Sequence, residues 1–189
     1  MKTILITGAS SGIGCALAKI YAENSHNLVL VARREEKLKD LKEELEKKHS
    51  ISVIIEVMDL SKKENLEILS LKYKNIDVLI NNAGLGQYGK FDSYNLETDI
   101  SMINLNILTP IILTKFFAKS MKNGSKIINI ASTAGFQPVP LMATYSATKS
   151  FIVDFTLAIQ REYSNINISL FCPGETRTEF QQVAKRPKS

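Results

Sequence analysis

Tyr145 and Lys149 stand four residues apart, at the two ends of a Tyr-Ser-Ala-Thr-Lys segment. On a helix this spacing places both side chains on one face, about 6 Å apart along the axis. An ammonium group held beside a phenol favours the phenolate and lowers the phenol's pKa from a reference value near ~10. Such a pair can donate or accept a proton near neutral pH. In isolation such a pair is far more often an ordinary tyrosine and lysine on a solvated helix, so the case for a catalytic pair must come from the rest of the chain.

A glycine-rich segment near the N-terminus could bind a phosphate. Residues 7–14 read Thr-Gly-Ala-Ser-Ser-Gly-Ile-Gly, directly after the apolar run 4–6 and before a helical pattern. A turn between a buried strand and a helix offers an anion free backbone N–H groups and the positive end of the helix dipole. The glycine spacing differs from the general G-x-G-x-x-G fingerprint, so a glycine-rich surface turn remains the alternative. The expected cofactor contacts are Gly8, Ser10, Ser11, Gly12, Ile13 and Gly14.

The second apolar run, 28–32, ends at Arg33 and Arg34 without a carboxylate. At this place an acidic residue would bind the ribose 2′-hydroxyl of NAD, whereas arginine accommodates the 2′-phosphate of NADP. A guanidinium group binds phosphate through paired hydrogen bonds and can also stack on adenine. Two solvated arginines are the alternative, but the pattern favours NADP.

Six short apolar runs alternate with helical patterns along the chain, at residues 4–6, 28–32, 53–57, 76–80, 126–131 and 166–171. This alternation indicates an α/β protein with a parallel sheet and right-handed crossovers. The expected fold is a doubly wound, Rossmann-like sheet with strand order 3-2-1-4-5-6, helices on both faces, and ligands beyond the carboxyl ends of the strands. In detail, Ser61 and Glu64 should form a capping box for the third helix, and Pro110 should end or bend a turn within the long helix after the fourth strand.

Composition excludes several classes of protein. The chain has 189 residues, of which 44% are hydrophobic and 23% charged, and is most simply one domain, 1–189. Its charge of +5 is spread among interleaved signs, which is typical of solvated helices rather than a nucleic-acid surface. Two distant cysteines and two histidines form no metal-binding pattern. No secretion signal and no apolar run of about 20 residues are evident, so we expect a cytoplasmic protein that binds neither membrane nor nucleic acid.

Taken together, the motifs closely resemble the short-chain dehydrogenase/reductase family, in its typical Tyr-x-x-x-Lys class. They occur in family order and spacing across nearly the whole chain, and Ala32-Arg33-Arg34 resembles the NADP-preferring members. The matching positions are 7–14, Asp59, 81–84, Asn106, Ser132, Tyr145 with Lys149, Pro173, Gly174 and Thr178.

The resemblance implies a role for each of four catalytic residues. Tyr145 would exchange a proton with the substrate oxygen during hydride transfer, and Ser132 would donate a hydrogen bond to the same oxygen. Lys149 would lower the pKa of Tyr145 and hold the nicotinamide ribose. Asn106 would position a water that passes protons to Lys149. Ser132 as a plain turn residue and Asn106 as a helix-bending polar group are the alternatives.

The same resemblance assigns the remaining cofactor contacts. Asp59 and Leu60 should lie near adenine, and the segment 82–84 beside the adenine ribose. The nicotinamide end should be shaped by the segment after the sixth strand. The residues concerned are Asp59, Leu60, Asn82, Ala83, Gly84, Pro173, Gly174, Thr176 and Thr178.

One feature departs from the family. Its members usually continue for about sixty residues beyond this point, adding a helical lid over the substrate and a seventh strand. A hydrophobic sixth strand left at the sheet edge is an aggregation hazard. We therefore expect that this sequence lacks the C-terminal part of the domain, or that a partner covers the edge.

The expected function is NADP(H)-dependent hydride transfer between nicotinamide and a small carbonyl compound or secondary alcohol. A 3-ketoacyl-carrier-protein reductase is an alternative, because the mostly apolar segment 136–143 suits a lipid-like substrate. A catalytically silent NADP-binding protein of the same fold is another. The family resemblance also implies a homodimer or homotetramer formed through the long helices after the fourth and fifth strands.

Overall fold

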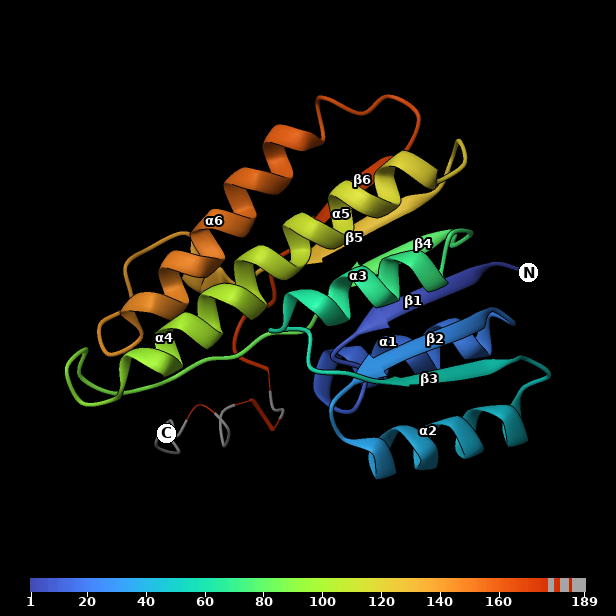
Figure 1. Ribbon diagram of the computed structural model, residues 1–189, viewed down its shortest axis with the longest axis horizontal. Helices are drawn as coiled ribbons and strands as arrows, with labels where there is room; N and C mark the ends of the chain where they lie inside the picture. Colours follow the sequence, from blue (N-terminus) through green and yellow to red (C-terminus); the bar gives the residue numbers. More distant parts are fainter. Residues whose placement is uncertain (177–178, 181–183, 185–189) are drawn as a thin grey trace.

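The computed structural model describes residues 1–176, 179, 180 and 184, and its centre is a six-stranded parallel sheet (Figure 1). The strand order is β3-β2-β1-β4-β5-β6, which confirms the predicted topology. The strands are β1 Thr3–Thr7, β2 Asn27–Ala32, β3 Val53–Val57, β4 Val78–Asn81, β5 Lys126–Ile130 and β6 Asn167–Phe171.

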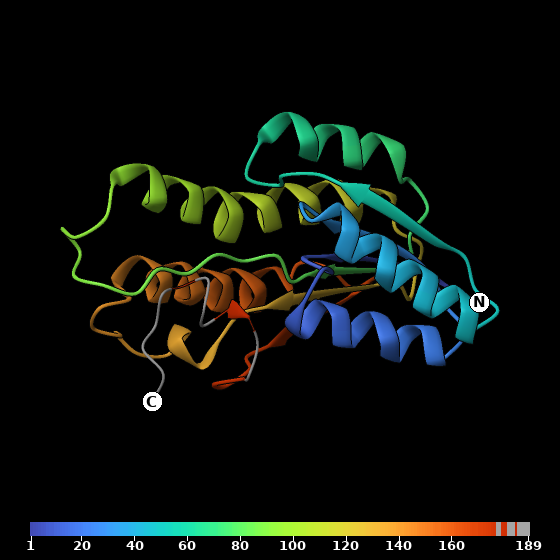
Figure 2. The same ribbon diagram turned by 90° about the horizontal axis from the view of Figure 1, so that it is seen from below.

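Helices cover both faces of the sheet, and Figure 2 shows α3 above it and α1 below it. Side chains of α1 and α2 pack on one face, and those of α3, α5 and α6 on the other. The helices are α1 Gly12–Glu23, α2 Glu35–Lys48, α3 Lys63–Lys72, α4 Leu96–Ile103, α5 Thr109–Ser120 and α6 Ala143–Ile159, with a 3₁₀ turn, η2, at Thr133–Gly135.

The two cores follow from the alternation of side chains along each strand. Leu5 pairs in register with Val29 and Leu79, and the same row continues through Ile127 to Ile168. These five side chains are at most 2% exposed and belong to the core beneath α3, α5 and α6. The neighbours of Leu5 along β1 point to the core of α1 and α2 instead. Burial of each aliphatic side chain stabilises the fold by about 1.5–3 kcal/mol. The buried side chains on the two faces of the sheet therefore hold the strand ends in place.

A single long helical stretch leads from α4 through the π-helical turn η1, Asn104–Leu108, into α5. Pro110 lies in the first turn of α5 and has no N–H to donate, which favours the wide turn before it. In place of a sharp bend at Pro110, the helix changes there from a π-helical turn to the α-helix α5. Within the 25-residue stretch Leu96–Ser120, an 18-residue window has a mean hydropathy of 1.5, so this stretch could cross a membrane by length and composition. The expectation that no apolar stretch reaches such a length was wrong, although a core helix of a soluble protein meets the same criterion.

The start of α3 differs from the prediction. The helix begins at Lys63, and no side chain caps its first residues. The Ser61 N–H and hydroxyl both donate to Asp59 Oδ1, at 3.0 and 2.8 Å. The predicted capping box of Ser61 and Glu64 is therefore wrong, because Asp59 engages the serine first and forms a local turn.

Candidate active site

The carboxyl ends of the strands open into one cavity of about 730 Å³, where α/β sheets bind their ligands. Its volume is typical of sites for cofactors and small molecules. Gly14 and Asn106 do not line the cavity, and Thr178 falls outside the described residues. The other predicted residues all line it, namely Gly8, Ser10, Ser11, Gly12, Ile13, Arg33, Arg34, Asp59, Leu60, Asn82, Ala83, Gly84, Ser132, Tyr145, Lys149, Pro173, Gly174 and Thr176.

The glycine-rich turn requires glycine for two reasons. Gly8 and Gly12 have φ angles of +67° and +56°, a conformation that other residues rarely adopt. A Cβ atom on Gly8 would lie 2.8 Å from Ala83 Cα, and one on Gly14 would lie 2.5 Å from Asn82 Nδ2. The turn therefore lies directly against the segment after β4, and its glycines Gly8 and Gly12 line the cavity. These features fit the pyrophosphate of a dinucleotide.

Thr7 fixes the segment after β4 against this turn. Its Oγ1 accepts hydrogen bonds from the N–H groups of Asn82 and Ala83, at 2.9 and 3.0 Å. Asn82 Nδ2 in return donates to the carbonyl oxygens of Thr7 and Gly8, at 2.8 and 3.2 Å. The sequence prediction did not assign Thr7 a role beyond opening the glycine motif. A hydroxyl at the end of a buried strand, next to glycine, was the available signal.

Tyr145 lies in the first turn of α6 and is 8% exposed. Burial raises its pKa above the usual 10, and the Ser132 hydroxyl acts in the opposite direction through a hydrogen bond. The Lys149 Nζ atom lies 5.8 Å from the centre of the Tyr145 ring. The tyrosine and lysine share one helix face as predicted. Desolvation dominates the Tyr145 pKa, and Lys149 is not among the causes of its shift, so the predicted lowering by Lys149 stays a prediction.

Lys149 is 5% exposed, and its Nζ atom donates to the carbonyl oxygen of Ile130 at 3.0 Å. Burial lowers its pKa from 10.5 to about 8, while the nearby Cys172 thiol acts weakly against this shift. A buried ammonium with one hydrogen-bond acceptor is poorly solvated. Lys149 therefore still holds a positive charge at neutral pH but releases its proton more readily than an exposed lysine.

This shift predicts a pH dependence of folding stability. Below pH 8 both folded and unfolded chains hold the Lys149 proton, and the folded state bears the full cost of the buried ammonium. Between about 8 and 10.5 the folded protein has released a proton that the unfolded chain still binds, so the free energy of unfolding rises with pH. Urea denaturation should show wild type gaining stability relative to Lys149→Met from pH 7 to pH 9.5. A wild-type-minus-variant difference that does not change with pH would contradict the shift.

Asn106 lies in the π-helical turn and is 1% exposed. Its Oδ1 accepts from the Leu85 N–H at 2.8 Å, and its Nδ2 donates to the Leu85 carbonyl at 2.8 Å and to Thr148 Oγ1 at 3.0 Å. Thr148 in turn donates to the Tyr145 carbonyl at 2.7 Å. Asn106 thereby connects the loop after β4 to the first turn of α6. The sequence prediction missed Thr148, which lies inside the Tyr-x-x-x-Lys segment itself.

Asn106 also faces Lys149 across Gly84. A Cβ atom added to Gly84 would lie 3.5 Å from Asn106 Oδ1 and 3.6 Å from Lys149 Nζ. The two polar atoms therefore border the same small space beside the glycine backbone.

The cavity is apolar on the side of Tyr145. Met102 and Met142 are buried against the Tyr145 ring. The predicted apolar segment 136–143 contributes part of the wall, together with the polar side chain of Gln137. The partly buried residues packed here are Leu85, Tyr88, Ala134, Val139 and Phe180.

The two arginines after β2 diverge. Arg34 donates to the Ser10 hydroxyl from Nε at 3.1 Å and to the Ser11 hydroxyl from Nη2 at 2.7 Å. Arg33 lies near Asp59. Burial raises the pKa of Asp59, but hydrogen bonds from Ser61, aided by the Arg33 charge, outweigh it and hold that pKa below its usual value. Arg34 is thus tied to the glycine-rich turn, and Arg33 faces the carboxylate after β3.

Comparison with known proteins matches the short chain dehydrogenase family over residues 2–189. The chain is 36% identical to an NADP-dependent 3-hydroxy acid dehydrogenase of Schizosaccharomyces pombe, over 96% of this chain and 74% of that protein. It is 34% identical to a ketoacyl reductase of a Nostoc species, over 92% of this chain and 63% of that protein. The fold matches a short-chain dehydrogenase from Sphingobium yanoikuyae in complex with NADPH, with a TM-score of 0.92 and 33% identity, over 98% of this chain and 75% of that one.

The chain is shorter than the curated proteins it resembles. It spans between 51% and 74% of their lengths. The similarity extends over 92% to 96% of this chain, so nearly every element described above has its counterpart in those proteins.

Proposed function

Because the chain belongs to the short chain dehydrogenase family, we propose that it is an oxidoreductase transferring hydride between a nicotinamide dinucleotide and a carbonyl or secondary alcohol. The observation that supports this most strongly is the meeting of Tyr145, Ser132 and Lys149 with the glycine-rich turn in one cavity. The test is consumption of NADPH, followed at 340 nm, with a panel of aldehydes and ketones. We expect oxidation of NADPH with at least one class of carbonyl compound. Binding of NADPH without oxidation by any of them would refute the proposed enzymatic activity.

The dinucleotide, when bound, supplies or accepts the hydride. In the reduction direction Tyr145 donates its phenolic proton to the substrate oxygen, and the Ser132 hydroxyl donates a hydrogen bond to the same oxygen. In the oxidation direction the Tyr145 phenolate removes the hydroxyl proton of the alcohol, while the Ser132 hydroxyl stays hydrogen-bonded to the substrate oxygen. The apolar wall around Tyr145 excludes water and favours a carbonyl compound with apolar substituents.

Lys149 and Asn106 support the tyrosine. We propose that Lys149 holds the nicotinamide ribose and stabilises the tyrosinate once a bound dinucleotide excludes water, because charges attract more strongly at low dielectric. Asn106 Oδ1 and Lys149 Nζ border one space beside Gly84, which suits a water that relays protons to the lysine. Asn106 additionally positions α6 through Thr148.

We propose NADP(H) as the coenzyme. Two of the similar proteins are named for NADP or NADPH, and the cavity has two arginines after β2. The glycine-rich turn would hold the pyrophosphate of the coenzyme, and the cations beside this turn would hold the 2′-phosphate.

The arginines predict a preference that can be measured. Wild type should bind NADPH at least ten times more tightly than NADH, because a charged hydrogen bond is worth about 1.5–3 kcal/mol. Replacing both Arg33 and Arg34 by alanine should strongly reduce this preference while changing NADH affinity little, as measured by isothermal titration calorimetry. Arg161→Ala is a matched control, since Arg161 is exposed beyond α6 and does not line the cavity. Equal NADPH and NADH affinities in wild type and variant would contradict the assignment.

A ketoacyl-carrier-protein reductase is the second candidate. The similarity to the Nostoc ketoacyl reductase and the apolar wall near Tyr145 favour it. Rates with an acyl-carrier thioester and with small ketones would separate the candidates. A third reading, a silent NADP-binding protein, predicts NADPH binding without turnover on either substrate class.

We further propose that residues 1–189 form one domain and that the protein works in the cytoplasm as a homodimer or homotetramer. Support for assembly comes from exposed apolar side chains along α4 and η1, where Leu96 is 66%, Ile100 47% and Leu108 43% exposed. Light scattering after size-exclusion chromatography would give the number of subunits.

A further inference from the structure

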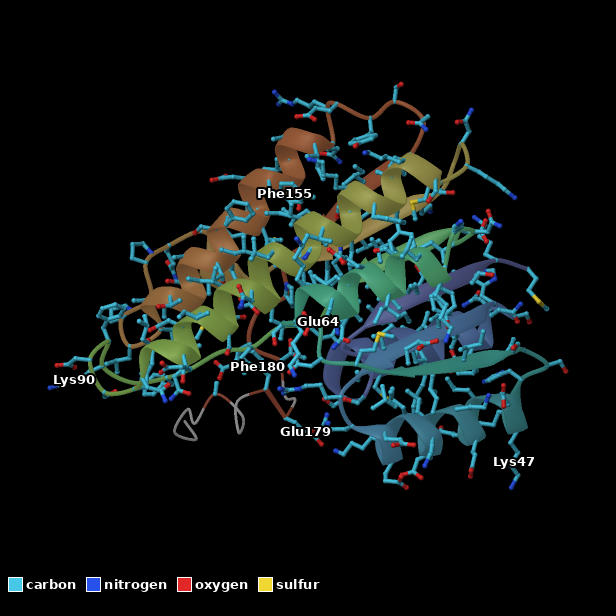
Figure 3. All side chains as sticks on the ribbon, viewed as in Figure 1. Lys47, Glu64, Lys90, Phe155, Glu179 and Phe180 are labelled. Carbon is cyan, nitrogen blue, oxygen red and sulfur yellow. The ribbon has the colours of Figure 1, made fainter. Side chains whose placement is uncertain are left out.

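Glu179, in the C-terminal segment, forms ion pairs with Arg34, which lines the cavity together with Glu179, and with the neighbouring Lys37. Arg34 Nη1 donates to Glu179 Oε2 at 2.6 Å, and Lys37 Nζ donates to the other oxygen, Oε1. Figure 3 labels Glu179 on this segment, beside the loop that leads from β2 into α2. The two basic residues are three positions apart, at the start of α2. We call Arg34 and Lys37 the anion clamp.

The anion clamp is held in place from the side of the glycine-rich turn. Arg34 uses Nε and Nη2 to bind the hydroxyls of Ser10 and Ser11, which leaves Nη1 for the anion. Lys37 reaches the same anion from the first turn of α2, and the two cations take one oxygen each. This is the arrangement that a phosphate monoester would meet, with the carboxylate of Glu179 standing in for two phosphate oxygens.

Given the proposed function, on which this inference rests, we propose that the anion clamp binds the 2′-phosphate of NADP and that Glu179 is an internal competitor for it. Lys37 then belongs to the coenzyme site, although the sequence pattern pointed only to the arginines. Glu179 covers the anion clamp while the coenzyme is absent and leaves it when the phosphate enters.

The exposure and charge of the groups determine which of the two anions binds the anion clamp more tightly. The side chains of Arg34, Lys37 and Glu179 are 43%, 45% and 38% exposed, so their ion pairs are weak and readily exchanged. Hydrogen bonds from Lys37 and Arg34 lower the pKa of Glu179 to about 2, so it carries one full negative charge at neutral pH. A phosphate monoester carries a charge of about −1.5 to −2 and one more oxygen. The phosphate therefore displaces the carboxylate, at the cost of breaking these contacts.

The same segment is anchored beside the catalytic tyrosine, which keeps Glu179 near the anion clamp. The Phe180 ring lies 5.2 Å from the Tyr145 ring, and the Ala184 carbonyl accepts from the Tyr88 N–H at 2.8 Å. Figure 3 labels Phe180 next to Glu179, on the side of Glu179 that lies away from α2. A tethered anion acts at a high effective concentration, so even a weak ion pair can compete.

The test is the affinity of purified protein for NADPH and NADH, measured by isothermal titration calorimetry. Glu179→Gln removes the competing charge and should tighten NADPH binding roughly twofold to fivefold, with NADH unchanged. Lys37→Ala removes a cation from the phosphate and should weaken NADPH binding roughly tenfold, again with little effect on NADH. In the Arg34→Ala/Lys37→Ala background, Glu179→Gln should no longer change NADPH affinity, because there is no anion clamp left to cover.

Two variants on α2 control for long-range charge effects. Lys39 pairs with Glu35 and Glu36 and not with Glu179, so Lys39→Ala and Glu36→Gln should leave the affinity ratio of NADPH to NADH unchanged. Melting temperatures establish that each variant is folded. If the Glu179→Gln variant does not fold, Glu179→Ala takes its place.

The outcomes separate this inference from the proposed function. Tight NADPH binding that is unaffected by Glu179→Gln would overturn the internal competitor, and an unaffected Lys37→Ala would overturn the anion clamp, with the oxidoreductase intact in both cases. A wild type that binds neither dinucleotide would overturn the proposed function and this inference with it.

Discussion

Replacing Tyr145 by phenylalanine should lower kcat for carbonyl reduction roughly 10²- to 10⁴-fold, the usual contribution of a positioned proton donor. The substitution removes the phenolic oxygen that exchanges its proton with the substrate and leaves the ring in place. Because that ring packs against Met102 and Met142, phenylalanine keeps the buried contacts and the fold. Steady-state rates of NADPH oxidation measure the effect, and the NADPH dissociation constant should change little.

Tyr21→Phe is the matched control for this substitution. Tyr21 lies on α1 and packs against the core between α1, α2 and the sheet, so loss of its hydroxyl should leave kcat unchanged. Full turnover in Tyr145→Phe, with an unchanged melting temperature, would show that Tyr145 is not the proton donor.

The second large effect is expected from Gly14→Ala. The added Cβ would lie less than 3.0 Å from the Gly8 carbonyl oxygen and 2.5 Å from Asn82 Nδ2. Neither atom can move freely, because Gly8 has a left-handed φ and Asn82 Nδ2 donates a hydrogen bond to the Thr7 carbonyl oxygen. Overpacking here should cost about 3 kcal/mol and lower the melting temperature by roughly 6–12 °C. Differential scanning calorimetry and NADPH titration measure both consequences.

Gly174→Ala provides the contrast. Among the residues that the structure describes, no heavy atom lies within 4 Å of a Cβ built on Gly174, and its φ is not in the left-handed region, so the melting temperature should not change. A Gly14→Ala protein with wild-type melting temperature and NADPH affinity would mean that the turn is not packed as described.

The sheet was predictable because its order follows from local patterns. Short apolar runs separated by helical patterns imply parallel strands, and the strand order follows from the doubly wound rule. The strand boundaries differ by two residues at most, as at β4, where the run 76–80 became Val78–Asn81. The capping of α3 was not predictable, since Asp59 competes with the helix for Ser61 through a local turn.

The composition of the site was also predictable, but its electrostatics were not. Motif spacing brings Tyr145, Ser132 and Lys149 to one cavity. The direction of the Tyr145 pKa shift depends on burial, which spacing does not reveal. Lys37 meets Glu179 across 142 residues of sequence, and no local pattern predicts such a contact. The divergence of Arg33 and Arg34 similarly depends on which partners the tertiary structure provides.

The most direct test of hydride transfer uses NADPH in which both hydrogens at C4 of the nicotinamide ring are replaced by deuterium. The protein, the labelled coenzyme and an apolar ketone that supports turnover are incubated, and the product alcohol is examined by mass spectrometry. The proposed chemistry predicts one deuterium on the carbinol carbon, while the hydroxyl proton comes from Tyr145 and exchanges with water. NADPH consumption without deuterium in the alcohol, or the absence of any alcohol across the carbonyl panel, would contradict it.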